Sequence, residues 1–463
     1  MSAARAARAD GGRVGTRAAW IIAPIGACGI GLAAAQGVAI AFAAGAALAV
    51  LLVSLGTRTL VRALVASTYV TRPRLQIGHS SGAIGVRGGL HLLPEHLLVA
   101  VTCVVAVMNG QGHRLLRAAQ RPTMILLGAY IVYAAGISTL YSPSPSRSLA
   151  VIGWLGLSWV VAVVIAALFD SAPALERQIV IWGVVAAVVA IALFATGRLT
   201  GHDLAVQPEP NTGGRALFGL AYEANILGST LSLAAFIAIT ARRHVISRRL
   251  LSLALPPMFL AIVLSLTRAA VLGLLIGLVL WTFLAHGAWG RVLPVAALSF
   301  AVAVGAAAMF PSIARPAEQK FGELFNIQSG TGRNRVDKWN AALGDMDVRA
   351  WIFGSGFNSF GQRHVEPTLT AIGAPGYLGN VGLEVLYDTG LVGSALLGLA
   401  LRAVWPRDRA RRRRALGLLA VFLVTSTATS TFWFGSTWTL VALALLSRAS
   451  SSTGRTNQPD ASR

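Results

Sequence analysis

Two arginines stand at the start of long apolar runs, where a charge is costly. Arg268 opens the run in SLTRAAVLGLLIGL, and Arg215 precedes another run in the glycine-rich segment NTGGRALFGLAYEANILG. A guanidinium near the hydrocarbon core of a membrane costs roughly 2.5 to 3.5 kcal/mol on insertion scales unless it pairs or reaches water. Because guanidinium is planar and keeps its proton, two of them suit a pyrophosphate, including a lipid pyrophosphate. The alternative is that both side chains only reach lipid headgroups.

Other common chemistries find little support in the sequence. Cys28 and Cys103 lie inside apolar runs, so they build neither a disulfide framework nor a metal site. There is no phosphate-binding loop or dinucleotide fingerprint, which agrees with a reaction that uses no nucleotide. No cluster of acidic residues is expected to hold Mg²⁺ or Mn²⁺, although Asp345, Asp347 and Glu366 leave that option open.

The composition places these residues in a membrane. Of the 463 residues, 55% are hydrophobic and 12% charged, and the mean hydropathy is +0.67. The net charge of +22 comes almost entirely from arginines, which cluster between apolar runs as in cytoplasmic loops of membrane proteins. Nucleic-acid binding is therefore a poor interpretation.

Apolar stretches of about 15 to 22 residues follow one another along the chain, close to the length that crosses a bilayer as a helix. They lack the period-2 alternation of barrel strands, and lipid leaves no other way to satisfy the backbone. The sequence predicts an all-α, polytopic transmembrane helical bundle of about twelve spans. The candidate spans are 19–35, 38–55, 92–108, 124–140, 149–168, 178–195, 224–240, 250–265, 268–286, 292–310, 381–402, 415–429 and 432–447.

The arginine clusters orient these spans. Residues 242–249 and 402–414 carry the strongest cytoplasmic signals. Counting helices between them puts Arg215, Arg268 and the polar stretch 311–380 on the external face. Nearer the N-terminus the count leaves residues 58–87 on the wrong side, so we expect that 92–108 is not a full crossing.

This organisation divides the chain into five parts. We expect residues 1–17 to be a cytoplasmic segment and 18–310 to form transmembrane helices. Residues 311–380 form an external loop with short helices, since a loop of this length is usually functional or independently folded. Residues 381–447 return to the membrane, and 448–463, rich in Ser and Thr, form a disordered cytoplasmic tail.

Four blocks between residues 213 and 393 carry a family resemblance. In order and spacing, GGRALFGLAYEANILG, SLTRAAVLGLLIGL, GRNRVDKWNAALGDMDVRAWIFGSGFNSF and GNVGLEVLYDTGLVG resemble the O-antigen ligase and O-antigen polymerase superfamily over roughly residues 120 to 450. The resemblance implies a membrane glycosyltransferase without a cofactor, in which Arg215 and Arg268 hold the diphosphate of a polyprenyl-linked glycan. It also matches Arg335 and Trp339 to the family's external loop, and Gly354 and Gly356 to its glycine-rich turn.

One family position differs. Family ligases end this loop with a His-Asn pair ahead of a Gly-x-x-Gly, and the His is thought to assist the attacking hydroxyl. Here Asn380 is present, but Gly379 replaces the His. Substitutes for the base are His364, Glu366 and Glu384, of which His364 is the first choice because its usual pKa suits neutral pH. The alternative for His364 is that it is only a solvent-exposed side chain. The alternative for Glu384 is that it is only the structural partner of an arginine.

Further substrate contacts follow from the resemblance. Tyr222, Glu223 and Asn225 occupy a polar turn of the family and could contact sugar hydroxyls, together with Arg335 and Asn380. Asn225 could instead cap a helix. The aromatic residues of the loop, Trp339, Phe357 and Phe360, are expected to form its own small core.

The predicted reaction transfers a glycan from a polyprenyl diphosphate to a hydroxyl of a lipid or glycan acceptor. It takes place at the external face of the inner or plasma membrane, with both termini in the cytoplasm. A polymerase that joins lipid-linked repeats is the alternative within the class. A transporter or flippase of an anionic lipid-linked substrate is the alternative from another class, although the sequence shows no internal repeat.

Overall fold

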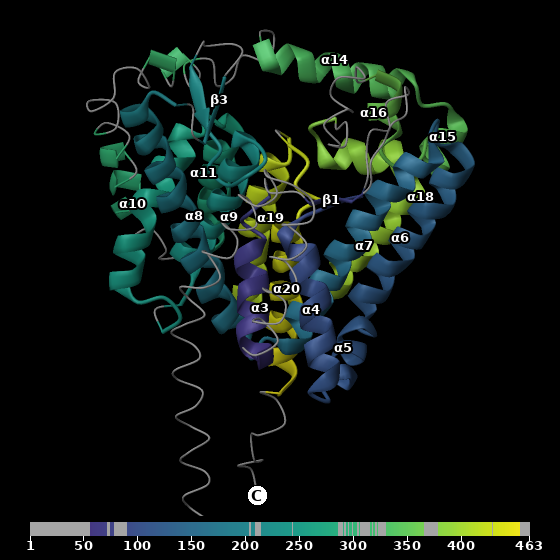
Figure 1. Ribbon diagram of the computed structural model, residues 1–463, viewed down its shortest axis with the longest axis horizontal. Coiled ribbons are helices and arrows are strands. Elements are labelled where there is room, and N and C mark those ends of the chain that lie inside the picture. Colours follow the sequence, from purple (N-terminus) through teal and green to yellow (C-terminus); the bar gives the residue numbers. More distant parts are fainter. Residues whose placement is uncertain are drawn as a thin grey trace, which may run out of the picture.

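Helices form most of the chain in this computed structural model (Figure 1). It describes residues 56–71, 75–77, 90–202, 205–208, 214–242, 244–285, scattered positions between 290 and 322, 330–364, 378–427 and 429–453. The elements are α3 (Gly56–Ser67), β1 (Leu75–Ile77), β2 (Leu90–Leu92), α4 (Pro94–Met108), α5 (Gly112–Ala119), α6 (Pro122–Tyr141), α7 (Pro145–Leu168), α8 (Ala172–Thr200), β3 (Val206–Pro208), β4 (Arg215–Leu217), α9 (Ala224–Thr240), α10 (Arg248–Leu264), α11 (Arg268–Leu284), α14 (Gly330–Gly344), α15 (Val348–Phe353), α16 (Ser359–His364), α18 (Val381–Val404), α19 (Arg409–Thr425) and α20 (Gly435–Thr453).

The predicted helical class is confirmed. By length and composition, α6, α7, α8 and α18 could each cross a membrane, and α4, α9 and α11 are shorter apolar helices. The expected total of about twelve spans stays a prediction. Two small antiparallel hairpins, β1–β2 and β3–β4, were not predicted, because strands of three residues leave no periodic signal.

The bundle has two distinct ends. Helices α14, α15 and α16 lie together with β3 at one end, and α5 lies at the opposite end (Figure 1); we call these the α14 end and the α5 end. The segment before α16 is fastened to the bundle through Phe357. Its amide donates to Ser138 Oγ of α6 at 2.8 Å, and its carbonyl accepts from Ser148 Oγ of α7 at 2.6 Å. The short helices within residues 311–380 therefore rest directly on the long ones.

Helix α3 changes the expectation for the N-terminal part. It buries Leu60 and Leu64 completely and keeps Arg58 exposed, and Asn109 at the end of α4 donates to Thr57 at the start of α3 (3.0 Å). The two helices are thus an antiparallel pair. Residues 58–67 therefore belong to a helix and not to a loop, and the prediction that 92–108 is not a full crossing stays a prediction, with α4 counted among the shorter apolar helices.

A buried ion pair joins three helices at the α5 end. Arg414 of α19 donates from Nη1 to Glu176 Oε1 of α8 at 2.5 Å and from Nε to Thr240 Oγ1 of α9 at 2.9 Å. The Glu176 side chain is 8% exposed. Because a buried carboxylate needs a partner of opposite charge, this contact fixes the position of α19 against α8 and α9.

Some predictions fall outside the described residues. These include the N-terminal segment 1–17, the candidate spans 19–35 and 38–55, most of 292–310, and Glu366. The predicted tail was placed too early, because α20 continues to Thr453; residues 454–463 lie outside the described part.

Candidate active site

The β3–β4 hairpin and the start of α11 hold the two predicted arginines at the α14 end. Pro208 pairs with Arg215 in the hairpin register, and Arg268 is the first residue of α11. The residues beside them share one small apolar cluster, composed of Ala216, Phe218, Ala224 and Leu266. The cluster brings the loops that carry both arginines together. Arg215 is exposed and Arg268 is half-buried, and each already interacts with other groups of the protein.

The turn before α11 is tied to the start of α9. Thr267 Oγ1 lies 3.2 Å from the carbonyl of Ala224, to which it donates, and 3.3 Å from Asn225 Oδ1. Asn225 is not the helix cap that was one of its two interpretations, because Glu223 occupies the N-cap position of α9. The backbone amide of Tyr222 donates to Thr71 Oγ1 at 2.8 Å, so the end of the α3 segment also supports this turn.

A turn after α19 links this region with α18. Thr429 Oγ1 donates to Glu223 Oε1 at 2.5 Å, and the hydroxyl of the next residue, Ser430, lies close to the carboxylate of Glu384. Neither oxygen of Glu384 makes a hydrogen bond of good geometry to the described residues, and the residue is 6% exposed. The same turn also meets α18 where Val381 donates to the carbonyl of Ser426 at 3.2 Å.

His364, the first choice for the base, lies in a polar network that includes Tyr387 of α18. His364 Nε2 is 2.5 Å from Asp345 Oδ2, which also accepts from the hydroxyl of Tyr387 at 2.9 Å. Arg363 donates to that hydroxyl at 3.1 Å, and the Phe360 ring stacks on His364 at 4.7 Å between centroids. The His364 side chain remains 34% exposed. The carboxylate fixes one ring nitrogen of His364 and leaves part of the ring accessible.

Asp345 is ionised in this setting. Burial alone would raise its pKa, but hydrogen bonds from His364 and Tyr387 and the charges of His364 and Arg363 together hold the pKa below its usual value. Asp345 was considered in the sequence only as a metal ligand, and among the described residues there is no group of three or more potential metal-binding side chains.

Helix α14 adds positive charge at the same end. Arg335 and Lys338 are both half-buried, and burial together with the charge of Arg335 lowers the pKa of Lys338. Lys338 was not singled out in the sequence. Trp339 of the same helix donates from Nε1 to the carbonyl of Leu378 at 3.1 Å. The helix is thereby attached to the segment that leads into α18.

Two aromatic residues of the loop, Phe360 and Phe357, belong to different cores, and Trp339 is a member of neither. Phe360 packs in the small core of the α14 end, as expected, with Ala342, Met346, Ala350, Leu378 and Tyr387. Phe357 instead joins the main core of the bundle and meets the Trp433 ring edge-on at 4.6 Å. The expectation of one separate core for all three aromatic residues was therefore wrong for Phe357.

The glycine-rich turn docks on a break in α18. Gly390 interrupts this helix with φ +63° and ψ −165°, and a Cβ there would lie 2.4 Å from the carbonyl oxygen of Ile352. The turn fills the space: Ser355 donates to the carbonyl of Tyr387 at 2.8 Å and Gly356 to that of Asp388 at 3.0 Å. These glycines serve close backbone packing, which fixes the α14 end on α18.

Gly379, at the position of the family histidine, lies at the entry to α18. Gly379 has φ +68°, a left-handed conformation that favours glycine. Asn380 follows it as N-cap of α18, and its Oδ1 accepts from the amide of Leu383 at 3.2 Å. The side-chain oxygen of Asn380, which the resemblance assigned to substrate, is thus engaged in capping.

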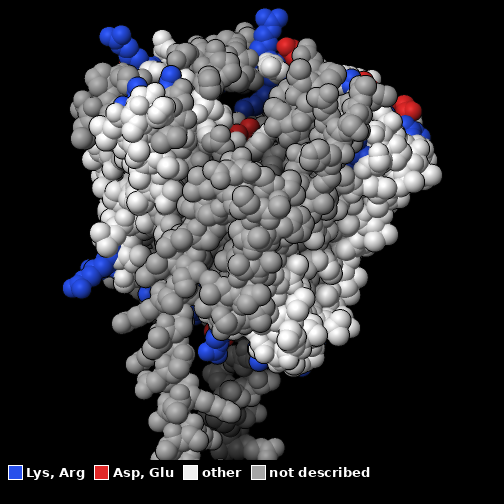
Figure 2. Space-filling model, in the orientation of Figure 1, with Lys and Arg blue, Asp and Glu red and all other residues white. Residues whose placement is uncertain are grey.

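The surface is hollowed close to α14, and both basic and acidic atoms are visible within the hollow (Figure 2). With the turn at residues 429–430, two groups of candidate residues meet at the α14 end. One consists of Arg215, Arg268, Tyr222, Glu223 and Asn225, and the other of Glu384, His364, Asp345 and Tyr387. An arrangement with guanidinium groups on one side and a carboxylate-bound imidazole on the other can bind an anion and accept a proton.

Comparison with known proteins agrees with the resemblance. Residues 253–398 match the family described as O-antigen ligase, a segment that includes Arg268, α14 to α16 and Glu384 but not Arg215. No curated protein matches the chain significantly. The chain therefore carries a match to an O-antigen ligase domain over residues 253–398, and together with the apolar helices this match supports the assignment to the membrane proteins of the O-antigen ligase and polymerase superfamily.

Proposed function

We propose that the protein transfers a glycan from a polyprenyl diphosphate to an acceptor hydroxyl, at the α14 end of the bundle. The turn after α19 carries the proposal, because Thr429 donates to Glu223, beside the arginines, and Ser426 accepts from Val381 at the start of α18. Helix α18 carries Glu384, one candidate base, and Tyr387, which is bonded to the network of the other, His364. The donor diphosphate and the acceptor hydroxyl need to meet within a few ångström, and a turn that bonds to both regions supports this arrangement.

Each group has a role in the reaction. The acceptor oxygen attacks the anomeric carbon of the donor sugar, and the bond from that carbon to the diphosphate oxygen breaks. The diphosphate leaves with the electron pair, and Arg215 and Arg268 stabilise its growing charge. The proton of the hydroxyl passes to Nδ1 of a neutral His364 ring, whose Nε2 is held by Asp345, and the carboxylate then stabilises the charged ring. Glu384 is the second candidate for this proton.

The arginines test the diphosphate role. Arg268→Ala and Arg215→Ala should each lower transfer about 100-fold or more, since the loss of one fixed donor to a developing anion has that effect in other enzymes. Arg268→Lys should restore only part of the activity, because an ammonium group cannot make two parallel bonds to phosphate oxygens. Arg198→Ala is the matched control, an exposed arginine at the end of α8. Unchanged transfer in both alanine variants at normal protein levels would remove the diphosphate role.

The base assignment has its own test. His364→Ala and Asp345→Ala should lower the rate of transfer about 100-fold or more with little change in donor binding. Glu384→Gln should have the larger effect if Glu384 is the base instead. The pair of measurements therefore separates the two candidates.

A polymerase joining lipid-linked repeats would use the same groups, with a second lipid-linked glycan as acceptor. Profiling lipid-linked glycans after deletion of the gene separates the two activities. Accumulated single repeats indicate lost polymerisation, and accumulated long chains indicate lost ligation.

Transport is the weaker candidate. Arg215 and Arg268 lie at the start of β4 and of α11, at one end of the bundle and not midway along a helix. This position favours a reaction at the surface of the membrane over passage through it. We assign the α14 end to the external face of the inner or plasma membrane, because the arginine-rich segment 402–414 is at the opposite end.

A further inference from the structure

A second cavity lies at the opposite end of the bundle from the candidate active site. It has a volume of about 810 Å³ and opens where α18 ends, α19 begins and α20 passes beside them. Its lining comes from Leu126 of α6 and from Gly398, Leu399, Leu401, Arg402, Ala403, Trp405, Pro406, Arg407, Arg412 and Arg448. Neither the family match nor the proposed reaction assigns a role to it.

The charge of this cavity has one sign. Four of its lining residues are arginines, and none of the described residues that line it is acidic. The nearest acidic residue in sequence, Asp408, caps α19 by accepting from the amide of Arg411 at 2.9 Å. Arg412 donates from Nε to the carbonyl of Pro406 at 3.4 Å, which holds the loop in place. An anion is the complementary ligand.

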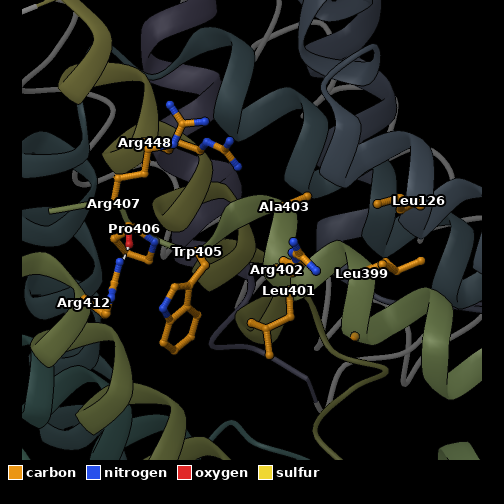
Figure 3. A pocket seen from close by; sticks show the side chains of 11 residues that line it. Leu126, Leu399, Leu401, Arg402, Ala403, Trp405, Pro406, Arg407, Arg412 and Arg448 are labelled. Carbon is orange, nitrogen blue, oxygen red and sulfur yellow. Dashed lines mark hydrogen bonds between the residues drawn. The ribbon is translucent and has the colours of Figure 1, made fainter. Parts of the chain in front are cut away.

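The rest of the lining is apolar and open to the surroundings. Leu399 is 49% exposed and Leu401 42% exposed, and Trp405 is half-buried. Figure 3 shows Arg407, Arg412 and Arg448 on one side of the pocket and Leu126 and Leu399 on the other, with Trp405 and Arg402 between them. Tryptophan between an apolar and a charged region is typical of the boundary between lipid tails and headgroups.

We propose that this cavity binds an anionic glycerophospholipid, whose phosphate contacts the arginines and whose acyl chain runs along the leucines. Basic pockets between membrane helices bind such headgroups in this way. A soluble phosphate compound would leave the leucines without an apolar partner, and a zwitterionic lipid would bring an ammonium group to the arginines. The bound lipid would join α6, α18, α19 and α20 at the end opposite the candidate active site.

Fluorescence quenching tests the proposal on the full-length protein. The protein is placed in nanodiscs of phosphatidylcholine that contain brominated phosphatidylglycerol or, at the same mole fraction, brominated phosphatidylcholine. Phosphatidylglycerol should quench tryptophan fluorescence more strongly, and Trp405→Phe should remove that difference. Each of Arg402→Gln and Arg412→Gln should lower the preference about fivefold, since one arginine near an anionic lipid surface contributes about 1 kcal/mol.

Two controls make the test specific. The variants Arg248→Gln and Arg249→Gln remove exposed charges at the start of α10, outside the cavity, and should keep the preference. Inorganic phosphate should not compete. Equal quenching by both lipids, an equal loss in the α10 variants, or displacement by inorganic phosphate would each overturn the proposal. The first outcome would also result if another protein segment occupied the cavity. Glycan transfer is not part of the readout, so failure of the proposed function would leave this result unaffected.

Discussion

Gly390 offers the sharpest test of how the α14 end is fixed to the bundle. Its backbone conformation is one that essentially only glycine adopts, so Gly390→Ala costs about 1 to 3 kcal/mol in backbone strain. The new methyl group would also lie 2.4 Å from the carbonyl oxygen of Ile352 and 2.6 Å from the amide nitrogen of Gly354. Forcing an atom into such a packed place costs about 1 to 3 kcal/mol more. Together these terms predict a loss of about 4 kcal/mol in the free energy of unfolding.

The matched control is Gly398→Ala in the same helix. A Cβ at Gly398 meets no atom within 4 Å, so this change should leave stability unchanged or raise it by up to about 1 kcal/mol. Both variants are unfolded with sodium dodecyl sulfate in mixed micelles, and transfer is measured in parallel. Gly390→Ala should lose transfer as well, because the turn before α16 can no longer rest on α18. Equal stability and equal transfer in the two variants would show that the break in α18 is not needed.

Three further outcomes follow from the contacts at the α14 end. Thr429→Val, which removes the hydroxyl bound to Glu223, should lower transfer about tenfold or more in a kinetic assay, because a hydrogen bond to a charged group contributes about 1.5 to 3 kcal/mol. The pKa of Asp345 lies below its ordinary value of 3.8, so its bonds contribute stability above that pH and lose it as the pH falls through the lower folded value. The free energy of unfolding should therefore fall more steeply below about pH 4 in the wild type than in Asp345→Asn. Gly379→His, which inserts the family residue at φ +68°, should cost about 1 to 2 kcal/mol in the same unfolding assay, and it should not raise transfer.

Candidate site residues could be predicted from the sequence where their role depends on the residue type and its immediate neighbours. Arg215 and Arg268 could be selected because a charge at the edge of an apolar run is costly wherever the chain folds. His364 could be selected because few side chains suit proton transfer at neutral pH. The order and spacing of the four sequence blocks then indicated the family, and the family match over residues 253–398 agrees with that resemblance.

Long-range contacts and short elements could not be predicted. The bond between Asp345 and Tyr387 joins residues 42 positions apart, and no local pattern in the sequence records it. The bond between Thr429 and Glu223 spans 206 positions. Helix α3 was missed because its 12 residues include Arg58 and Arg62, which lower its hydrophobicity below that of a membrane helix. Because α3 was missed, the prediction that the segment 92–108 is not a full crossing rested on a helix count without it, and it stays a prediction.

The ion pair between Arg414 and Glu176 means that the arginines from 407 to 414 are not equivalent. Positive charge in a loop favours its retention on the cytoplasmic side during synthesis, and for that effect the total number of charges matters more than their identity. After folding, Arg414 alone holds α8 and α9 through Glu176 and Thr240. A lysine at Arg407 would preserve the topology and the folded protein alike. A lysine at Arg414 would preserve the topology. It could not donate to Glu176 and Thr240 from two nitrogens at once, which is how Arg414 joins α19 to α8 and α9.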